Sequence, residues 1–86
     1  MAKPRSKKLN RAVDDFCEAM KTRLAKKERD GFRGWDNELS VTTKELARRA
    51  SDKCYDVENG IDVNKNSIDI ANLMMMVYFR KNNPNK

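Results

Sequence analysis

The stretch IDIANLMMMVYF, from Ile68 to Phe79, constrains the fold of this chain more than any other segment. Eleven of its twelve residues carry no charge, although 37% of the residues in the whole chain are charged. The run is shorter than the ~20 apolar residues that a membrane-spanning helix needs, and two basic residues end it. A helix that is apolar nearly all round must be covered nearly all round by other protein. We therefore expect this segment to be a helix at the centre of a homodimer or higher oligomer, packing on its own subunit and on a partner.

A first helix is predicted earlier in the chain, from Leu9 to about Lys27. Its apolar residues recur every three or four positions, which places them on one face of a helix. They are Leu9, Val13, Phe16, Met20 and Leu24. Ser6 is a suitable N-cap, and the helix should end before Gly31, because glycine is common just beyond helix ends.

A loop and a second helix are predicted next. The loop GFRGWDNELS contains two glycines and no helical period, and we expect its Phe32 and Trp35 to fold back over the core. Thr42 as N-cap and Glu45 three residues later form a capping box, which marks the start of the second helix. Asn-Gly at residues 59–60 should end it. The stripe that this helix should bury consists of Leu46, Ala50, Cys54 and Val57.

The third helix should begin between Asp62 and Ser67 and continue to about Lys81. Two other short helices cannot cover its apolar surface, so we predict an all-α three-helix bundle that is completed by homodimerisation through this C-terminal helix. Methionine suits such a contact because it adapts to irregular gaps. The expected oligomer interface residues are Leu73, Met74, Met76 and Val77. The alternative is an exposed groove on this helix that binds another protein.

The chain length of 86 residues predicts one domain. We divide the chain into a basic N-terminal arm (1–8), a single helical domain (9–81) and a C-terminal tail (82–86). Cys17 and Cys54 have neither CxxC nor zinc-type spacing, so we expect small buried hydrophobic residues in a reducing compartment. No apolar signal segment follows the basic N-terminus, which predicts a cytoplasmic protein without a membrane partner.

The absence of histidine excludes several kinds of chemistry. It removes histidine acid–base catalysis, nucleophile pairs that depend on histidine, and imidazole metal sites. Any reaction would therefore have to use carboxylates, lysine, arginine or hydroxyl groups.

The formal net charge of +6 favours an anionic partner, which could be a nucleic acid, a nucleotide or an acidic protein surface. Basic residues cluster in the N-terminal arm, at the end of the first helix with its loop, and at the start of the second helix. The expected contacts to nucleic acid or to an acidic partner are Lys3, Arg5, Lys7, Lys8, Lys26, Lys27, Arg48 and Arg49. Acidic residues such as Asp36 and Glu38 interrupt the loop cluster, so a merely solvated surface is the alternative.

Two segments of the chain resemble a known family. The turn GFRGWDN followed by a helix, and the later DIANLMMMVY, are similar to small phage-encoded members of the MazG-like, all-α nucleotide pyrophosphohydrolase superfamily. The resemblance covers Phe16 to Tyr78 and is most specific at DIANLMMMV. It implies that carboxylates from an E-x-x-E on one helix and an E-x-x-D on the next hold Mg²⁺. The metal then binds the phosphates of a nucleotide and activates the attacking water.

Carried over residue by residue, the resemblance supplies only two of these four carboxylates. Asp69 falls on the aspartate of E-x-x-D, with Asn66 in place of the glutamate. Asp56 falls on the second carboxylate of E-x-x-E, with Lys53 in place of the first. Asp52 is adjacent but points about 100° away on a helix. A lysine in this place repels a cation and pairs with the other carboxylates, so the resemblance implies that ordinary family catalysis is lost.

We therefore expect a non-catalytic MazG-like phage accessory protein in the host cytoplasm. It should bind a nucleotide, or inhibit a host or defence macromolecule, without a cofactor. The expected ligand-binding residues are Arg33, Trp35, Lys53, Asp56 and Asp69. Lys53 would neutralise phosphate, and Trp35 would stack on the ligand or close the pocket.

Three other interpretations stay open. A Mg²⁺-dependent nucleoside triphosphate pyrophosphohydrolase could use Asp52, Asp56 and Asp69 in a variant site, with Asp56 and Asp69 as metal ligands. A basic nucleic-acid-binding module could share only the architecture of the family. Structural roles would also explain the residues, with Asn66 as N-cap, Asp69 favoured by the helix dipole, and Asp56 in a solvated cluster with Arg49 or Lys53.

Overall fold

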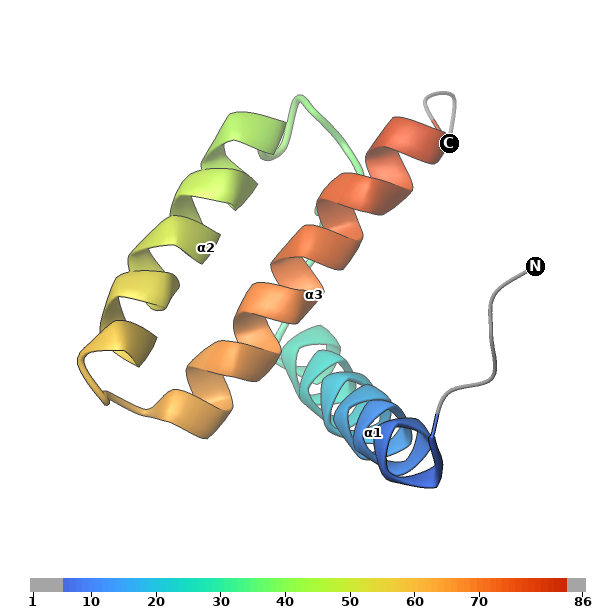
Figure 1. Cartoon of the computed structure of the whole chain (residues 1–86). Helices are drawn as coiled ribbons and strands as arrows, with labels where there is room; N and C mark the ends of the chain where they lie inside the picture. Colours follow the sequence, from blue (N-terminus) through green and yellow to red (C-terminus); the bar gives the residue numbers. More distant parts are fainter. Residues whose placement is uncertain (1–5, 84–86) are drawn as a thin grey trace.

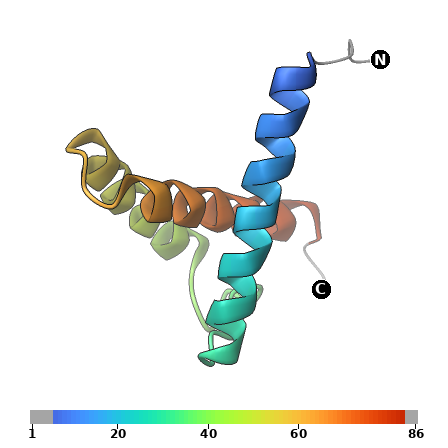
Figure 2. The same ribbon diagram turned by 90° about the horizontal axis from the view of Figure 1, so that it is seen from below.

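The computed structural model describes residues 6–83 and contains three helices: α1 (Lys7–Arg29), α2 (Thr43–Glu58) and α3 (Val63–Asn82). Within this part of the chain there is no strand, so the predicted all-α three-helix fold is confirmed. Helices α2 and α3 lie side by side and antiparallel, and α1 crosses α3 steeply (Figures 1 and 2). Both α1 and α2 pack on α3, which is the central helix. No helix among these residues is long and apolar enough to cross a membrane.

Two of the predicted helix starts are confirmed at the level of individual hydrogen bonds. The hydroxyl of Ser6 accepts a hydrogen bond from the N–H of Leu9 at 3.1 Å, which caps α1. The hydroxyl of Thr42 accepts from the N–H of Glu45 at 3.0 Å, which caps α2. The predicted stop after α2 is also present, because Gly60 has a φ of 73°, a conformation that glycine adopts without strain.

The start of α3 differs from the alternative in which Asn66 is its N-cap. Asp62 occupies the N-cap position in the left-handed region, with φ 42°, and its side chain makes no capping hydrogen bond. Asn66 lies inside the first turns of the helix, is buried, and donates from Nδ2 to the carbonyl oxygen of Ile61 at 2.9 Å. The tight turn after α2 starts the helix earlier than the Asn-x-x-Asp spacing indicated.

The hydrophobic core lies between α2 and α3. Leu46 and Ala50 from α2 are buried against Leu73 and Met76 from α3. Phe32 and Trp35 pack against this cluster from the loop, as predicted. A core of four buried apolar residues is small, so contacts at its edge contribute a large share of the stability.

Several residues of the predicted interface belong to this internal core. Leu73 and Met76 are 7% and 2% exposed, so a second copy cannot reach them while the bundle is closed. Val77 packs partly buried against the same cluster, whereas Met74 is 40% exposed. The apolar surface of α3 is covered by α2 on one side and by the loop and α1 on another, which the sequence pattern alone did not indicate.

The two cysteines were predicted to be buried, and this was wrong, because both are exposed. On α2 the buried stripe contains only Leu46 and Ala50, which face α3. Cys54, one turn further along, is exposed, whereas the adjacent Lys53 reaches Asp69 of α3.

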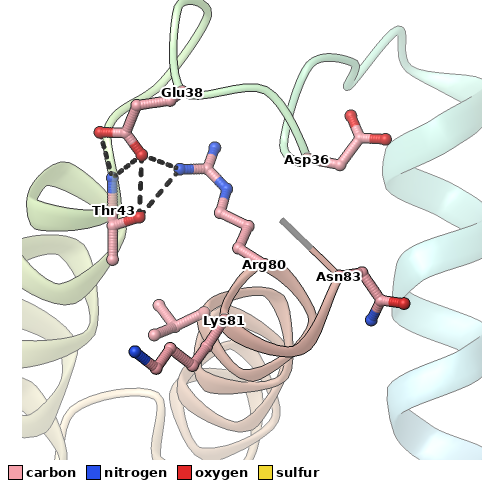
Figure 3. Close-up of a pocket in the computed structure, with 7 residues that line it drawn as sticks. Asp36, Glu38, Thr43, Arg80, Lys81 and Asn83 are labelled. Carbon is pink, nitrogen blue, oxygen red and sulfur yellow. Dashed lines mark hydrogen bonds and ion pairs between the residues drawn. The ribbon is translucent and has the colours of Figure 1, made fainter. Parts of the chain in front are cut away.

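The loop between α1 and α2 is fastened to the end of α3 by Arg80. Its guanidinium donates to the carbonyl oxygens of Trp35, at 2.8 Å, and of Val41. It also donates to Glu38 Oε1 at 3.0 Å and to Thr43 Oγ1 at 3.2 Å (Figure 3). The Arg80 side chain is 9% exposed, and its hydrogen bonds to Trp35, Val41 and Thr43 are partly buried, whereas Glu38 is exposed. These hydrogen bonds hold the loop, and with it the aromatic cover of the core, against α3.

Replacing Arg80 by alanine should lower the free energy of unfolding by about 2–4 kcal/mol, because several loop acceptors lose their charged donor together. Arg80→Lys should restore only part of the loss, since an ammonium cannot reproduce the planar set of donors. Urea unfolding followed by circular dichroism and by the fluorescence of Trp35 would measure the change. Arg48→Ala, at an exposed cation on α2, is the matched control. An effect of Arg80→Ala below about 0.5 kcal/mol would contradict this role.

Candidate functional site

One buried carboxylate, that of Asp69 on α3, connects all three helices. Its side chain is 2% exposed. Arg23 on α1 donates from Nε to Asp69 Oδ1 at 3.0 Å, and Nζ of Lys53 on α2 lies 3.5 Å from Oδ2. A buried carboxylate is tolerated only when cations and hydrogen bonds compensate for its lost hydration. The resemblance implied that Lys53 pairs with the remaining carboxylates, Asp56 and Asp69, and its ammonium does lie beside Asp69. The shorter contact from Arg23 was not predicted.

A pocket of about 190 Å³ lies beside this carboxylate, and we call it the Asp69 pocket. Its polar lining consists of Lys27, Arg49, Lys53, Asp69 and Asn72. Its apolar lining consists of Phe32, Leu73 and Met76. The pocket therefore combines a positively charged side with an aromatic and aliphatic side. Lys27 belongs to both, because its Nζ lies 5.6 Å from the centre of the Phe32 ring.

The charges in the pocket are unbalanced. Burial alone would raise the pKa of Asp69, but the hydrogen bond from Arg23 and the charges of Arg23, Lys27 and Lys53 hold its pKa below the usual 3.8. Asp69 is therefore ionised at neutral pH. Burial lowers the pKa of Lys27 below its usual 10.5, because Asp69 compensates only in part and the neighbouring cations oppose the charge further. The region thus has more positive charge than its single carboxylate neutralises.

Asn72 presents an unused acceptor to the same pocket. It is 2% exposed, and its Nδ2 donates weakly to the backbone carbonyl of Met20 at 3.4 Å. Among the described residues, Asn72 Oδ1 and Asp69 Oδ2 are the buried side-chain atoms without a hydrogen bond. Buried polar atoms are normally paired, so a ligand with an N–H or O–H group would satisfy an unmet requirement here.

The pocket does not bring together all of the predicted ligand-binding residues. Lys53 and Asp69 line it, but Asp56 does not. Arg33 instead donates to the carbonyl oxygens of Glu28 and Phe32, at 2.9 and 3.0 Å, and so holds the turn after α1.

Trp35 also lies outside the Asp69 pocket. Its ring packs edge to face against Phe79, with ring centroids 5.3 Å apart and planes 66° apart. It lines a separate shallow recess with residues of α1 and α3, among them Leu24 and Met75. Trp35 therefore helps to cover the hydrophobic core. The aromatic side chain that lines the Asp69 pocket is Phe32.

The predicted basic contact residues are spread over the molecule. Lys27 and Arg49 line the Asp69 pocket. Lys26 forms a surface ion pair with Asp30 at 2.8 Å, and Arg48 is exposed on α2. The other four are N-terminal: Lys7 and Lys8 begin α1, and Lys3 and Arg5 lie outside the described residues.

The donors around Asp69 do not fit Mg²⁺, which needs several oxygen ligands in octahedral geometry. Within residues 6–83, no three His, Cys, Asp or Glu side chains lie close enough together to hold a metal ion. Asp52 is exposed on α2, and the groups nearest to Asp69 are the cations of Arg23 and Lys53.

A second recess, of about 410 Å³, lies at the other end of α3 and is shown in Figure 3. Asp36, Glu38, Arg80 and Lys81 line it. Charges of both signs meet there, and the guanidinium of Arg80 is already engaged by the loop. In this recess Arg80 therefore already has a structural role, which is to hold the loop.

Arg23 and Asn72 are the site residues that sequence reasoning missed. Asp69 and Asn72 interrupt the apolar run three residues apart, a spacing that puts both on one face of a helix. Arg23 and Lys27 are four residues apart and border the apolar stripe of α1 beside Leu24. These spacings were the available signals.

Comparison with known proteins adds no further assignment. No family model, no curated protein and no solved structure matches this chain. The interpretation of the site therefore rests on its own composition: a small pocket with an apolar side, a cationic side, and the acceptor Asn72 Oδ1, which has no hydrogen bond.

The stability of the protein should depend on the ionisation of Asp69. At neutral pH, Asp69→Asn should lower the free energy of unfolding by about 1–3 kcal/mol, because Arg23 and Lys53 lose their counter-charge. Since folding lowers the pKa of Asp69, its contribution is present above pH 3.8 and is lost as the pH falls through the lower folded value. The difference between wild type and variant should therefore shrink in acid.

Urea unfolding at neutral pH and at successive acidic pH values would test this dependence. Asp52→Asn, which removes an exposed carboxylate from α2, is the control and should show a small effect throughout. A difference between wild type and Asp69→Asn that stays constant into strong acid would show that the ion pairs are not its source.

Proposed function

We propose that this protein binds a nucleotide in the Asp69 pocket without a metal ion and does not hydrolyse it. The observation that carries this proposal is the charge balance: Lys27, Arg49 and Lys53 line the pocket with a single carboxylate, that of Asp69, which Arg23 already contacts from α1. A phosphate group would supply the missing negative charge and accept charge-assisted hydrogen bonds. The resemblance to MazG-like phage proteins supports a nucleotide as the source of that phosphate.

The phosphates would contact Lys27, Arg49 and Lys53. Lys27 has the clearest need for an anion, because burial and neighbouring cations already disfavour its charge. Lys53 approaches Asp69 only to 3.5 Å, so its ammonium has donor capacity left. Where the family uses a carboxylate and a metal ion to hold phosphate, a lysine would do so directly.

The base would lie toward the apolar side of the pocket. Phe32 offers a partly exposed ring for stacking, and the buried Leu73 and Met76 form the floor of the pocket beneath it. The carbonyl of Met20 orients the amide of Asn72 so that its Oδ1 is the free acceptor. An N–H group on the edge of a base would satisfy that oxygen.

A protein of this kind acts by binding its ligand and not by converting it. It would sequester a nucleotide, or use nucleotide binding to inhibit a host or defence macromolecule that responds to the same ligand. This is the role that we propose for it as a non-catalytic MazG-like phage accessory protein.

Isothermal titration with dNTPs and NTPs, in EDTA and in Mg²⁺, would test the proposed binding. We expect an affinity that does not require Mg²⁺ and no release of pyrophosphate. Lys27→Ala should weaken binding about tenfold, which corresponds to about 1.4 kcal/mol. Lys44→Ala removes an exposed cation of α2 that does not line the pocket, and should leave the affinity unchanged.

Other outcomes of this titration would favour the other interpretations. Mg²⁺-dependent binding with pyrophosphate release, abolished by Asp69→Asn, would identify a variant pyrophosphohydrolase and overturn the proposal. Binding of DNA or RNA but not of nucleotides, with a steep dependence on salt, would favour the nucleic-acid-binding module. Absence of any nucleotide binding would refute the proposed function.

The position of the base can be tested separately at Asn72. Asn72→Leu keeps the approximate volume of the side chain but removes the acceptor, so nucleoside triphosphate affinity should fall about tenfold. Affinity for inorganic tripolyphosphate should not change, because the cations are retained. Equal losses for both ligands would place the phosphates, and not the base, against Asn72.

A further inference from the structure

The Asp69 pocket lies between two helices that do not pack on each other. Among the described residues, the backbone of α1 packs on α3 but not on α2. The pocket is nevertheless lined by Lys27 of α1 and by Arg49 and Lys53 of α2. A ligand that contacts these three side chains would therefore connect two helices that have no backbone contact of their own.

Helix α1 is attached to the rest of the molecule more weakly than α2. None of its residues is fully buried, whereas α2 contributes two residues to the buried core. The first turns of α1 extend well beyond α3 (Figure 2). Its polar contacts with α3 are the ion pair from Arg23 to Asp69 at 3.0 Å and a hydrogen bond from Asn72 to the carbonyl oxygen of Met20 at 3.4 Å. An element with few buried apolar contacts opens at a lower free energy than the core does.

The segment that follows α1 gives this helix a point about which it can move. Arg80 fastens the loop to α3 through the carbonyl oxygens of Trp35 and Val41, so the loop can stay in place when α1 opens. Gly31 lies between these anchors and the end of α1, and its φ of 95° is a conformation that glycine adopts without strain. A change of backbone torsion near this glycine would move α1 as a unit, as in a hinge.

The cations of α1 and α2 repel one another across the pocket. Burial is the main cause that lowers the pKa of Lys27; Asp69 opposes it, and the charges of Arg23, Lys53 and Lys65 lower the pKa further. Because Arg23 already contacts Asp69, this carboxylate compensates the other cations only in part. A phosphate between the two helices would replace their repulsion by a common attraction to one anion.

We propose that the ligand of the Asp69 pocket docks α1, so that filling the site draws this helix onto α2 and α3. The inference rests on the proposed function for the nature of the ligand, and it adds what binding does to the protein. A phosphate contacts Lys27 together with Arg49 and Lys53 only while α1 is docked. It therefore binds the docked arrangement more tightly and shifts the population towards it. Occupancy of the pocket is thereby converted into the position of the N-terminal helix.

Hydrogen–deuterium exchange of the full chain in EDTA, measured by mass spectrometry, would test this coupling. In the protein alone, the amides of residues 11–28 in α1 should exchange faster than those in the middle of α3, because α1 opens independently. Saturating inorganic tripolyphosphate should slow exchange in α1 about tenfold, since the bound anion must be released before the helix opens. Isothermal titration of the same samples would establish saturation.

Two neighbouring lysines provide a matched pair of variants. Lys27→Ala, at saturating tripolyphosphate, should abolish the slowing in α1, because Arg49 and Lys53 still hold the anion but α1 no longer contacts it. Lys26→Ala should retain the slowing, since Lys26 pairs with Asp30 at the surface and does not line the pocket. Circular dichroism would verify that both variants are folded.

Three results would overturn the docking of α1 and leave the proposed function standing. The first is exchange in α1 that is as slow as in α3 in the protein alone. The second is tripolyphosphate that binds but leaves exchange in α1 unchanged. The third is slowing that persists in saturated Lys27→Ala, because the ligand would then act without contacting α1. If neither tripolyphosphate nor a nucleoside triphosphate binds, the titration itself refutes the proposed function, and the docking fails with it.

Discussion

The arrangement of this small protein depends on the compensated charge of Asp69. A carboxylate that is 2% exposed needs partners, and here they come from the two other helices, Arg23 on α1 and Lys53 on α2. The contact from Arg23 matters most for the fold, because no residue of α1 is fully buried and apolar packing alone holds this helix weakly. The ion pair therefore helps to determine where α1 crosses α3, and with it the position of Lys27 beside the Asp69 pocket.

The same interaction determines the chemistry of the pocket. Cations gathered around one carboxylate leave an excess of positive charge, which disfavours Mg²⁺ and favours an anion. Lys53 points to the buried carboxylate of Asp69, and Lys27 and Arg49 line the same pocket. This excess of cations beside an apolar surface is what supports the proposed nucleotide binding.

The second constraint on the fold is that the apolar surface of α3 must be covered. Other residues of the same chain cover most of it. Helix α2 covers one side, and the loop with Phe32 and Trp35 covers another. Arg80 holds that loop in place through its hydrogen bonds to backbone carbonyls. Some apolar side chains stay exposed, among them Met74 and Tyr78 on α3 and Leu9 on α1.

The sequence by itself determined the features that depend on residues close together in the chain. Ser6 and Thr42 were identifiable as helix caps, and the first two helices followed from the three- and four-residue spacing of their apolar residues. Only the tertiary structure shows that Arg23, 46 residues away in the chain, contacts Asp69. It also shows that Oδ1 of Asn72 has no hydrogen bond and that both cysteines are exposed. The physical reason is range: helix caps and stripes arise within one or two turns, whereas these contacts depend on the angle at which α1 crosses α3.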